Sequence, residues 1–133
     1  MNKLVSIMTF TNAMTFTNAI KSGFNNYVNF NGRATRSEYW YWYLFLCLLS
    51  ICTTLIDTVA FPYSMWSPTS SIAGIVTLLP GFSVTVRRLH DTNRSGWWTL
   101  LPITVIGIFV LLYWMIKKSD QAENSYGGSK LAD

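Results

Sequence analysis

The chain has 133 residues, of which 50% are hydrophobic, 16% are aromatic and only 12% are charged. A soluble domain carries about twice that charged fraction, so the composition excludes an ordinary water-soluble fold and predicts a single-domain membrane protein. The net charge of +4 does not indicate a nucleic-acid partner, because the basic residues cluster at the ends of apolar segments and not along a polar face.

The N-terminus contains a perfect tandem repeat, since residues 8–13 and residues 14–19 both read MTFTNA. A repeat of six residues is too short for a repeat architecture. We therefore interpret residues 1–14 as a dispensable extension, and either Met1 or Met14 would serve as the start. The extension lacks the continuous apolar core of a secretion signal.

Residues 15–28 predict an amphipathic helix. Its apolar side chains recur at spacings of four, four, three and one, at Phe16, Ile20, Phe24, Tyr27 and Val28. The stretch is too short and too polar to span a bilayer, so we expect it to lie in the headgroup plane before the first spanning helix. The alternative is that the same face packs against the protein itself.

A capping box follows the turn at Asn31–Gly32. Thr35 and Glu38 have the spacing of a capping box, in which the Thr35 hydroxyl accepts from the Glu38 amide. The Glu38 carboxylate in turn accepts from the Thr35 amide. Pairing of the Glu38 carboxylate with Arg33 or Arg36 is the alternative.

The first spanning helix is predicted over residues 39–60, and aromatic residues 39–43 form a belt at headgroup level. Asp57 is the only charged residue in this segment. It lies about 26 Å beyond Trp40 along a helix axis, so we expect its carboxylate to reach the opposite interface. A functional role inside the membrane is the alternative.

The second helix is predicted over residues 71–86, antiparallel to the first, after a short uncharged loop. Pro80–Gly81 lies inside this helix, and we expect a kink or a break there, because proline removes one helical hydrogen bond. Broken helices can mark ligand sites in membrane proteins, but plain kinks are also tolerated.

The hinge, residues 87–96, carries three arginines, the only histidine and an aspartate. A third spanning helix is predicted over residues 97–116, with Ser95 as its N-cap. The fold class is therefore an all-α membrane protein in which an interfacial amphipathic helix precedes three transmembrane helices. The membrane domain covers residues 15–118, and residues 119–133 are expected to form a polar, loosely ordered tail.

The distribution of basic residues predicts the orientation. Four precede the first span (Lys3, Lys21, Arg33, Arg36), three lie in the hinge (Arg87, Arg88, Arg94), and three lie in the tail (Lys117, Lys118, Lys130). The positive-inside rule places the N-terminus and the hinge in the cytoplasm and the tail outside. A re-entrant third segment, which returns the tail to the cytoplasm, is the alternative.

Two motifs resemble those of a known family: FNGRATRSEYW at residues 30–40, and RRLHD with SGWW at residues 87–91 and 95–98. They are similar to a family of small bacterial inner-membrane proteins catalogued as domain of unknown function 805. The resemblance extends over about residues 16–127, and the chain departs from it at Gly128, where a proline usually follows. It implies an integral inner-membrane protein of a few helices, and it implies no activity, substrate or catalytic residue.

The first functional hypothesis is a membrane binding or scaffold module. Arginine guanidinium groups bind phosphate with several hydrogen bonds in a planar fork, so an arginine cluster flanked by tryptophans predicts contact with anionic lipid or with a partner. With so few helices, we also expect a homo-oligomer or a larger membrane partner. The predicted site comprises Arg33, Arg36, Arg87, Arg88, Arg94, Trp40, Trp97 and Trp98. The alternative is that these arginines only fix the orientation.

Two further hypotheses remain. An enzyme acting on lipid-linked substrates would use His90 and Asp91 for acid–base chemistry. The sequence offers no second histidine, metal-ligand cluster or nucleophile motif, so we expect no metal or cofactor and favour a protein that is not an enzyme. A small transporter or channel subunit would use Asp57 and the Pro80–Gly81 break, but the chain lacks a repeat of its helices or a row of intramembrane charges.

Overall fold

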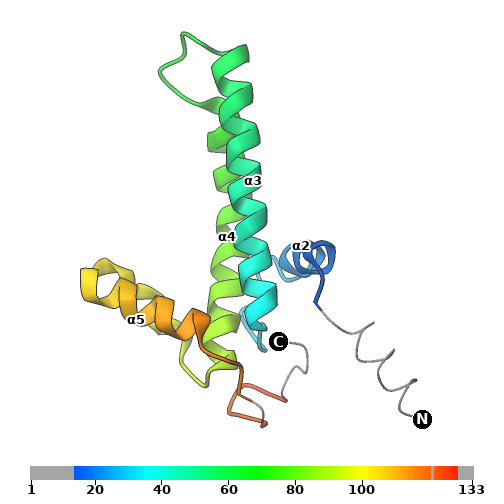
Figure 1. Cartoon of the computed structure of the whole chain (residues 1–133), viewed down its shortest axis with the longest axis vertical. Coiled ribbons are helices and arrows are strands. Elements are labelled where there is room, and N and C mark those ends of the chain that lie inside the picture. Colours follow the sequence, from blue (N-terminus) through cyan, green and yellow to red (C-terminus); the bar gives the residue numbers. More distant parts are fainter. Residues whose placement is uncertain (1–13, 121, 129–133) are drawn as a thin grey trace, which may run out of the picture.

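The computed structural model describes residues 14–120 and 122–128, which form an all-helical fold; the predicted extension lies outside them except for Met14. A long antiparallel hairpin of two helices, α3 (Arg36–Ala60) and α4 (Pro68–Asp91), is its central element (Figure 1). Each helix is about 36 Å long or slightly more, compared with roughly 30 Å for the hydrocarbon core of a bilayer. Both are apolar enough to cross a membrane.

Three shorter helices lie crosswise near the lower end of the hairpin (Figure 1). On one side, α2 (Phe16–Asn25) packs against α3. On the other side, the 3₁₀ helix η1 (Gly96–Ile103) packs against α5 (Val105–Ile116). The hairpin thus has one bare end and one end surrounded by other segments.

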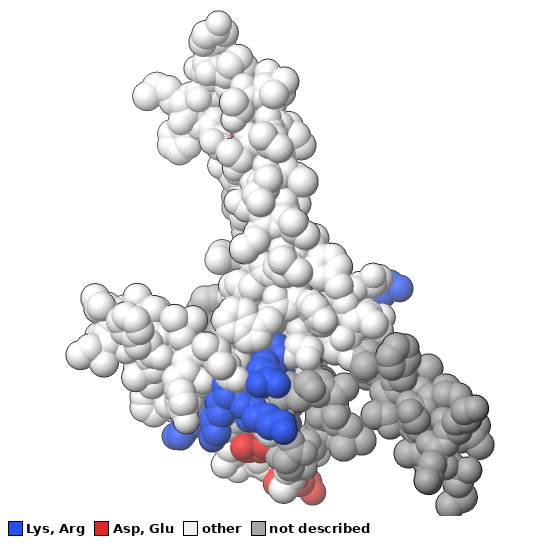
Figure 2. Space-filling view, viewed as in Figure 1, with Lys and Arg blue, Asp and Glu red and all other residues white. Residues whose placement is uncertain are grey.

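The bare end of the hairpin has an apolar surface. Large aliphatic side chains are exposed there from both helices, including Leu48, Ile51, Leu55, Ile72 and Ile75. Figure 2 shows no lysine or arginine over this region on the face in view. A continuous exposed apolar surface of this kind suits lipid and not water.

Asp57 lies at the bare end, where it caps α4. Its carboxylate accepts hydrogen bonds from the backbone amides of Thr69 and Ser70, each at 2.9 Å, and from the Ser70 hydroxyl at 2.7 Å. A carboxylate at a helix N-terminus satisfies free amides and stabilises the positive end of the helix dipole. Asp57 therefore has a structural role in joining α3 to α4.

Helix α4 is longer than predicted and is not broken. It extends to Asp91, so the first five residues of the predicted hinge are helical, and it continues through Pro80. Proline at position 80 deprives the Val76 carbonyl of its helical amide partner. The Tyr27 hydroxyl donates to that carbonyl at 2.6 Å and replaces the missing bond.

The prediction of one continuous helix over residues 97–116 is wrong, because η1 and α5 are separated by a turn at Thr104. Thr104 begins α5 by accepting from the Gly107 amide at 3.1 Å, and Pro102 cannot donate to a helical bond. A Cβ atom at Gly107 would lie 1.9 Å from the Leu101 carbonyl oxygen, so glycine permits the close return of the chain. With 12 residues, α5 is about 18 Å long and too short to cross a bilayer.

Helix α2 ends at Asn25, three residues before its predicted end, and it packs on α3 through small residues. Ala19 and Gly23 are buried, and a Cβ atom at Gly23 would lie 2.3 Å from the ring of Trp42. Phe24 meets the Trp42 ring edge to face, with 5.4 Å between the ring centroids. Part of the predicted apolar face therefore contacts the protein itself.

Candidate functional site

Five charged side chains are buried at the lower end of the hairpin. Arg33 precedes α3, Glu38 lies in its first turn, and Arg87, Arg88 and Asp91 lie at the end of α4. None of them exposes more than 2% of its surface. We call these five residues the buried charge cluster.

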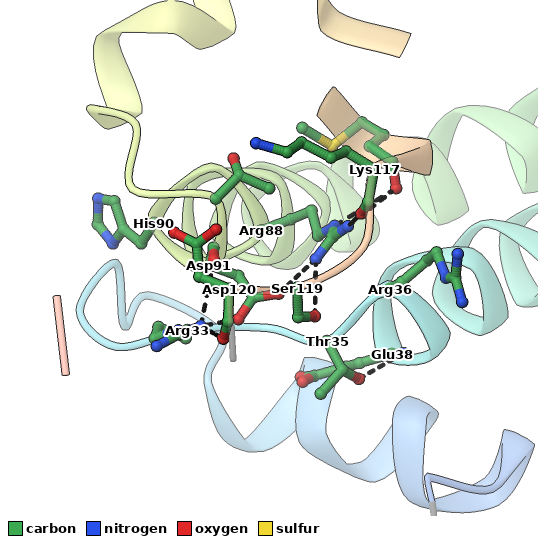
Figure 3. Close-up of polar contacts among 12 residues, drawn as sticks. Arg33, Thr35, Arg36, Glu38, Arg88, His90, Asp91, Lys117, Ser119 and Asp120 are labelled. Carbon is green, nitrogen blue, oxygen red and sulfur yellow. Dashed lines mark hydrogen bonds and ion pairs between the residues drawn. The ribbon is translucent and has the colours of Figure 1, made fainter. Parts of the chain in front are cut away.

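Asp91 joins two of the arginines. Its Oδ1 accepts from Nε of Arg33 at 2.8 Å, and its Oδ2 accepts from Nη1 of Arg88 (Figure 3). Arg33 lies 58 residues away along the chain. The carboxylate therefore fixes the loop before α3 against the last turn of α4.

Glu38 makes the third ion pair of the cluster. Its Oε1 accepts from Nη1 of Arg87 at 2.8 Å and from the Ser22 hydroxyl on α2. The Thr35 hydroxyl accepts from the amide of Glu38 at 3.1 Å, which confirms the first half of the predicted capping box. Glu38 thus links α2, α3 and α4.

Three guanidinium groups face two carboxylates, and Arg33 and Arg88 direct further N–H donors at backbone carbonyls. Arg33 donates to the carbonyls of Asp120, Ala122 and Gly127. Arg88 donates to the carbonyls of Met115 and Lys117 at the end of α5. The partial negative charge of a helix C-terminus suits such a cation.

These contacts hold the described part of the tail at the same end of the hairpin as the hinge. The sequence predicts that the tail and the hinge lie on opposite sides of the membrane, whereas in the structure the described part of the tail lies beside the hinge and contacts Arg33. The short α5 brings the chain back to the arginines, since its last carbonyls accept from Arg88.

The predicted arginine site separates into two groups, since Arg33, Arg87 and Arg88 belong to the buried charge cluster. Arg36 is half-buried and approaches the Ile116 carbonyl at 3.5 Å, and Arg94 is exposed, with its guanidinium carbon 4.8 Å from the centroid of the Trp114 ring. Basic side chains gather at this lower end in Figure 2. We call the four residues around the end of α5 the basic rim: Arg36, Arg94, Lys117 and Lys118.

The three tryptophans of the predicted site also lie in two different places. Trp40 donates from Nε1 to the Met115 carbonyl at 3.2 Å, and Trp98 meets Trp114 edge to face, so both lie beside the end of α5. Trp97 instead lines a groove beside α4 and is 81% exposed. Two of the three tryptophans therefore flank the basic rim.

His90 and Asp91 do not form an acid–base pair. The Asp91 carboxylate binds two arginines, whereas Nδ1 of His90 lies 3.0 Å from the Gly32 carbonyl oxygen. Figure 3 shows the imidazole on the other side of the α4 end from Arg88. Within residues 14–120 and 122–128, no three His, Cys, Asp or Glu side chains gather as a metal site.

Sequence reasoning missed the part that the tail plays in the site. Asn124 donates from its side chain to the His90 carbonyl at 3.0 Å and accepts from the Tyr126 amide at 2.9 Å. The Tyr126 ring stacks on the His90 ring with 4.0 Å between the centroids. The sequence does contain one signal for this ordered tail. Residues 124–127 begin with asparagine and end with glycine, and both residue types favour a turn.

Comparisons with known proteins agree with the resemblance noted in the sequence. The inner membrane protein YhaH of Escherichia coli (strain K12) is 36% identical over 109 residues, which cover 77% of this chain and 87% of the relative. The inner membrane protein YhaI of the same strain is 38% identical over 104 residues, which cover 77% and 86%. No solved structure matches the chain. The model of the family described as Protein of unknown function (DUF805) matches residues 27–128, and the chain belongs to this family as an inner-membrane protein.

Proposed function

We propose that the protein is a membrane binding module whose basic rim holds phosphate groups of anionic lipid. The observation that carries this proposal is the division of the basic residues. Three arginines form ion pairs inside the protein, and the four residues of the basic rim surround the end of α5 with exposed or half-exposed side chains. Arginine and lysine side chains at a membrane surface attract anionic headgroups.

The proposed placement puts α3 and α4 across the bilayer and the lower end of the hairpin in the cytoplasm. The positive-inside rule supports it, because all described lysines and arginines lie at or near that end, whereas residues 61–67 carry no charge. In this placement α2, η1 and α5 lie in the headgroup region and the adjacent part of the inner leaflet. The tail then lies on the cytoplasmic side.

The buried charge cluster supports this function indirectly. Arg88 holds the Met115 and Lys117 carbonyls, and Trp40 shares the Met115 carbonyl. These bonds fix the end of α5, which the four residues of the basic rim surround. A fixed array of cations binds a phosphate with less loss of side-chain entropy than independent surface residues do.

The test is native mass spectrometry of the protein purified with equal amounts of phosphatidylglycerol and phosphatidylcholine. The variant Arg36→Gln/Arg94→Gln should retain much less phosphatidylglycerol than the wild type. At about 1 kcal/mol for each cation near the surface, the relative affinity should fall roughly thirtyfold. The same spectra give the copy number and so test the expected homo-oligomer.

The matched control is Lys21→Gln, which removes one exposed charge from α2 and none from the basic rim. It should change phosphatidylglycerol retention by about fivefold at most, the effect of a single surface cation. Unchanged retention in the double variant, or an equal loss in the control, would show that the basic rim is not a lipid site.

A further inference from the structure

A groove beside the last turns of α4 is separate from both the buried charge cluster and the basic rim. Its volume is about 560 Å³, within the range of roughly 300–1,000 Å³ that is typical of small-molecule sites. Phe82, Val86 and His90 line it from α4, and the start of η1 and Tyr126 complete its walls. Apart from His90, its lining contains no ionisable group other than the Tyr126 phenol.

The polarity of the groove changes along α4. His90 and Tyr126 lie at its lower end, level with the tail, and Phe82 lies two helical turns, or about 12 Å, further along the helix axis. Because α4 is one of the two apolar helices, this axis is the direction in which a lipid extends from its head group into the membrane. The groove therefore has the polarity of a lipid molecule, with a polar lower end and an apolar interior.

The chemistry of the polar end follows from the His90 ring. A carbonyl oxygen only accepts, so the 3.0 Å contact with Gly32 requires the hydrogen on Nδ1. His90 is 8% exposed and has no carboxylate partner in the described structure, which favours the neutral ring. In that tautomer Nε2 is an acceptor, and no described residue donates to it.

We propose that this groove binds one phospholipid whose head group donates a hydrogen bond from an amine or a hydroxyl to Nε2 of His90. One acyl chain lies along Val86 and Phe82. A phosphodiester without an N–H or O–H donor does not satisfy Nε2, so the requirement differs from that of the basic rim. The stacked Tyr126 ring, with 2° between the ring planes, holds the imidazole in the required orientation.

The experiment compares phosphatidylethanolamine with phosphatidylcholine, which share the phosphate and acyl chains but differ in N–H donors. Each lipid is titrated into delipidated protein in detergent, and binding is measured by native mass spectrometry. The wild type should bind the first lipid about tenfold more tightly, as expected for one hydrogen bond to a buried acceptor. A phosphatidylethanolamine with a photoreactive acyl chain should crosslink to the peptide that contains Phe82 and Val86.

Two substitutions separate the ligand contact from folding. In His90→Asn the amide nitrogen replaces Nδ1 and keeps the bond to Gly32, but the Nε2 acceptor is lost, so the tenfold preference should disappear. In His90→Gln the side-chain amide reaches the position of Nε2, so a preference should remain. The loss of phosphatidylglycerol binding caused by Arg36→Gln/Arg94→Gln should be the same in the wild type and in both His90 variants.

Equal affinity of the wild type for the two lipids would overturn the proposal, whatever the variants do. So would a preference that persists in His90→Asn, or an isoprenoid phenol that occupies the groove in place of phospholipid. If the preference for phosphatidylethanolamine were lost in Arg36→Gln/Arg94→Gln and kept in His90→Asn, the lipid would bind at the basic rim. That result would also refute the proposed groove site.

Discussion

At the scale of single residues, Arg33 uses all three nitrogen atoms of its guanidinium group. Nε binds the Asp91 carboxylate, and the two Nη atoms donate to carbonyls of Asp91 and of the tail residues Asp120, Ala122 and Gly127. A lysine carries the same charge at one point and cannot hold partners in several directions. The planar geometry of the Arg33 guanidinium group, and not its charge alone, therefore holds the tail against the loop before α3.

Arg33→Lys should therefore destabilise the protein although it conserves the charge. We expect a loss of about 3 kcal/mol in the free energy of unfolding, because several hydrogen bonds from a buried cation to carbonyls are lost. Unfolding by sodium dodecyl sulfate in mixed micelles measures this change. The tail should also become more sensitive to protease.

Arg36→Lys is the control, since Arg36 is half-buried and belongs to the basic rim. It should change stability by no more than about 1 kcal/mol. If Arg33→Lys were as stable as this control, the contacts between Arg33 and the tail would not contribute to the fold.

At the scale of elements, α4 depends on a side chain from another part of the chain. Tyr27 follows α2 and donates to the Val76 carbonyl that Pro80 leaves without a helical partner. An unsatisfied carbonyl within an apolar environment is costly, because no water replaces the bond. The proline thus couples the position of α2 to the continuity of α4.

Tyr27→Phe should cost about 1–3 kcal/mol in the free energy of unfolding, the desolvation penalty of one unpaired polar group. The loss should be accompanied by faster hydrogen exchange at amides near residue 80. Tyr63→Phe is the control, since Tyr63 is 98% exposed in the loop between α3 and α4. Equal stabilities of the two variants would mean that the Tyr27 bond does not support α4.

The sequence predicted the features that depend on neighbouring residues. Thr35 and Ser95 cap helices as their spacing indicates, because a cap needs only the amides two or three residues away. The pairings of Arg33 with Asp91 and of Tyr27 with Val76 span 58 and 49 residues, and no local pattern encodes them. The apolar run over residues 97–116 also concealed the turn at Thr104, since the close approach of Gly107 to Leu101 is visible only in three dimensions.

At the scale of the whole molecule, the hairpin of α3 and α4 has two different ends, because α5 brings the tail back to the end at which the hinge lies. The loop before α3, the hinge and the described tail meet at one end of the hairpin, and residues 61–67 form the other end (Figure 1). A third spanning helix would instead place the tail with residues 61–67. The two arrangements differ in which positions share a compartment.

Single cysteines at exposed positions distinguish them. In a background in which Cys47 and Cys52 are replaced by serine, Asn31→Cys, Met65→Cys and Ser125→Cys are labelled in intact cells with a membrane-impermeant maleimide. Only Met65→Cys should react before the membrane is opened, because the positive-inside rule places the basic end in the cytoplasm. Disrupted cells give the total reactivity of each position.

The pattern of labelling separates two claims. If Asn31→Cys and Ser125→Cys react together from outside, the orientation is inverted, but the return of the tail through α5 still holds. If Ser125→Cys reacts with Met65→Cys while Asn31→Cys is protected, the segment after the hinge crosses the membrane. The contacts of Arg33 with the tail would then not form in the membrane, since one side chain cannot bind carbonyls on both sides of a bilayer about 30 Å thick.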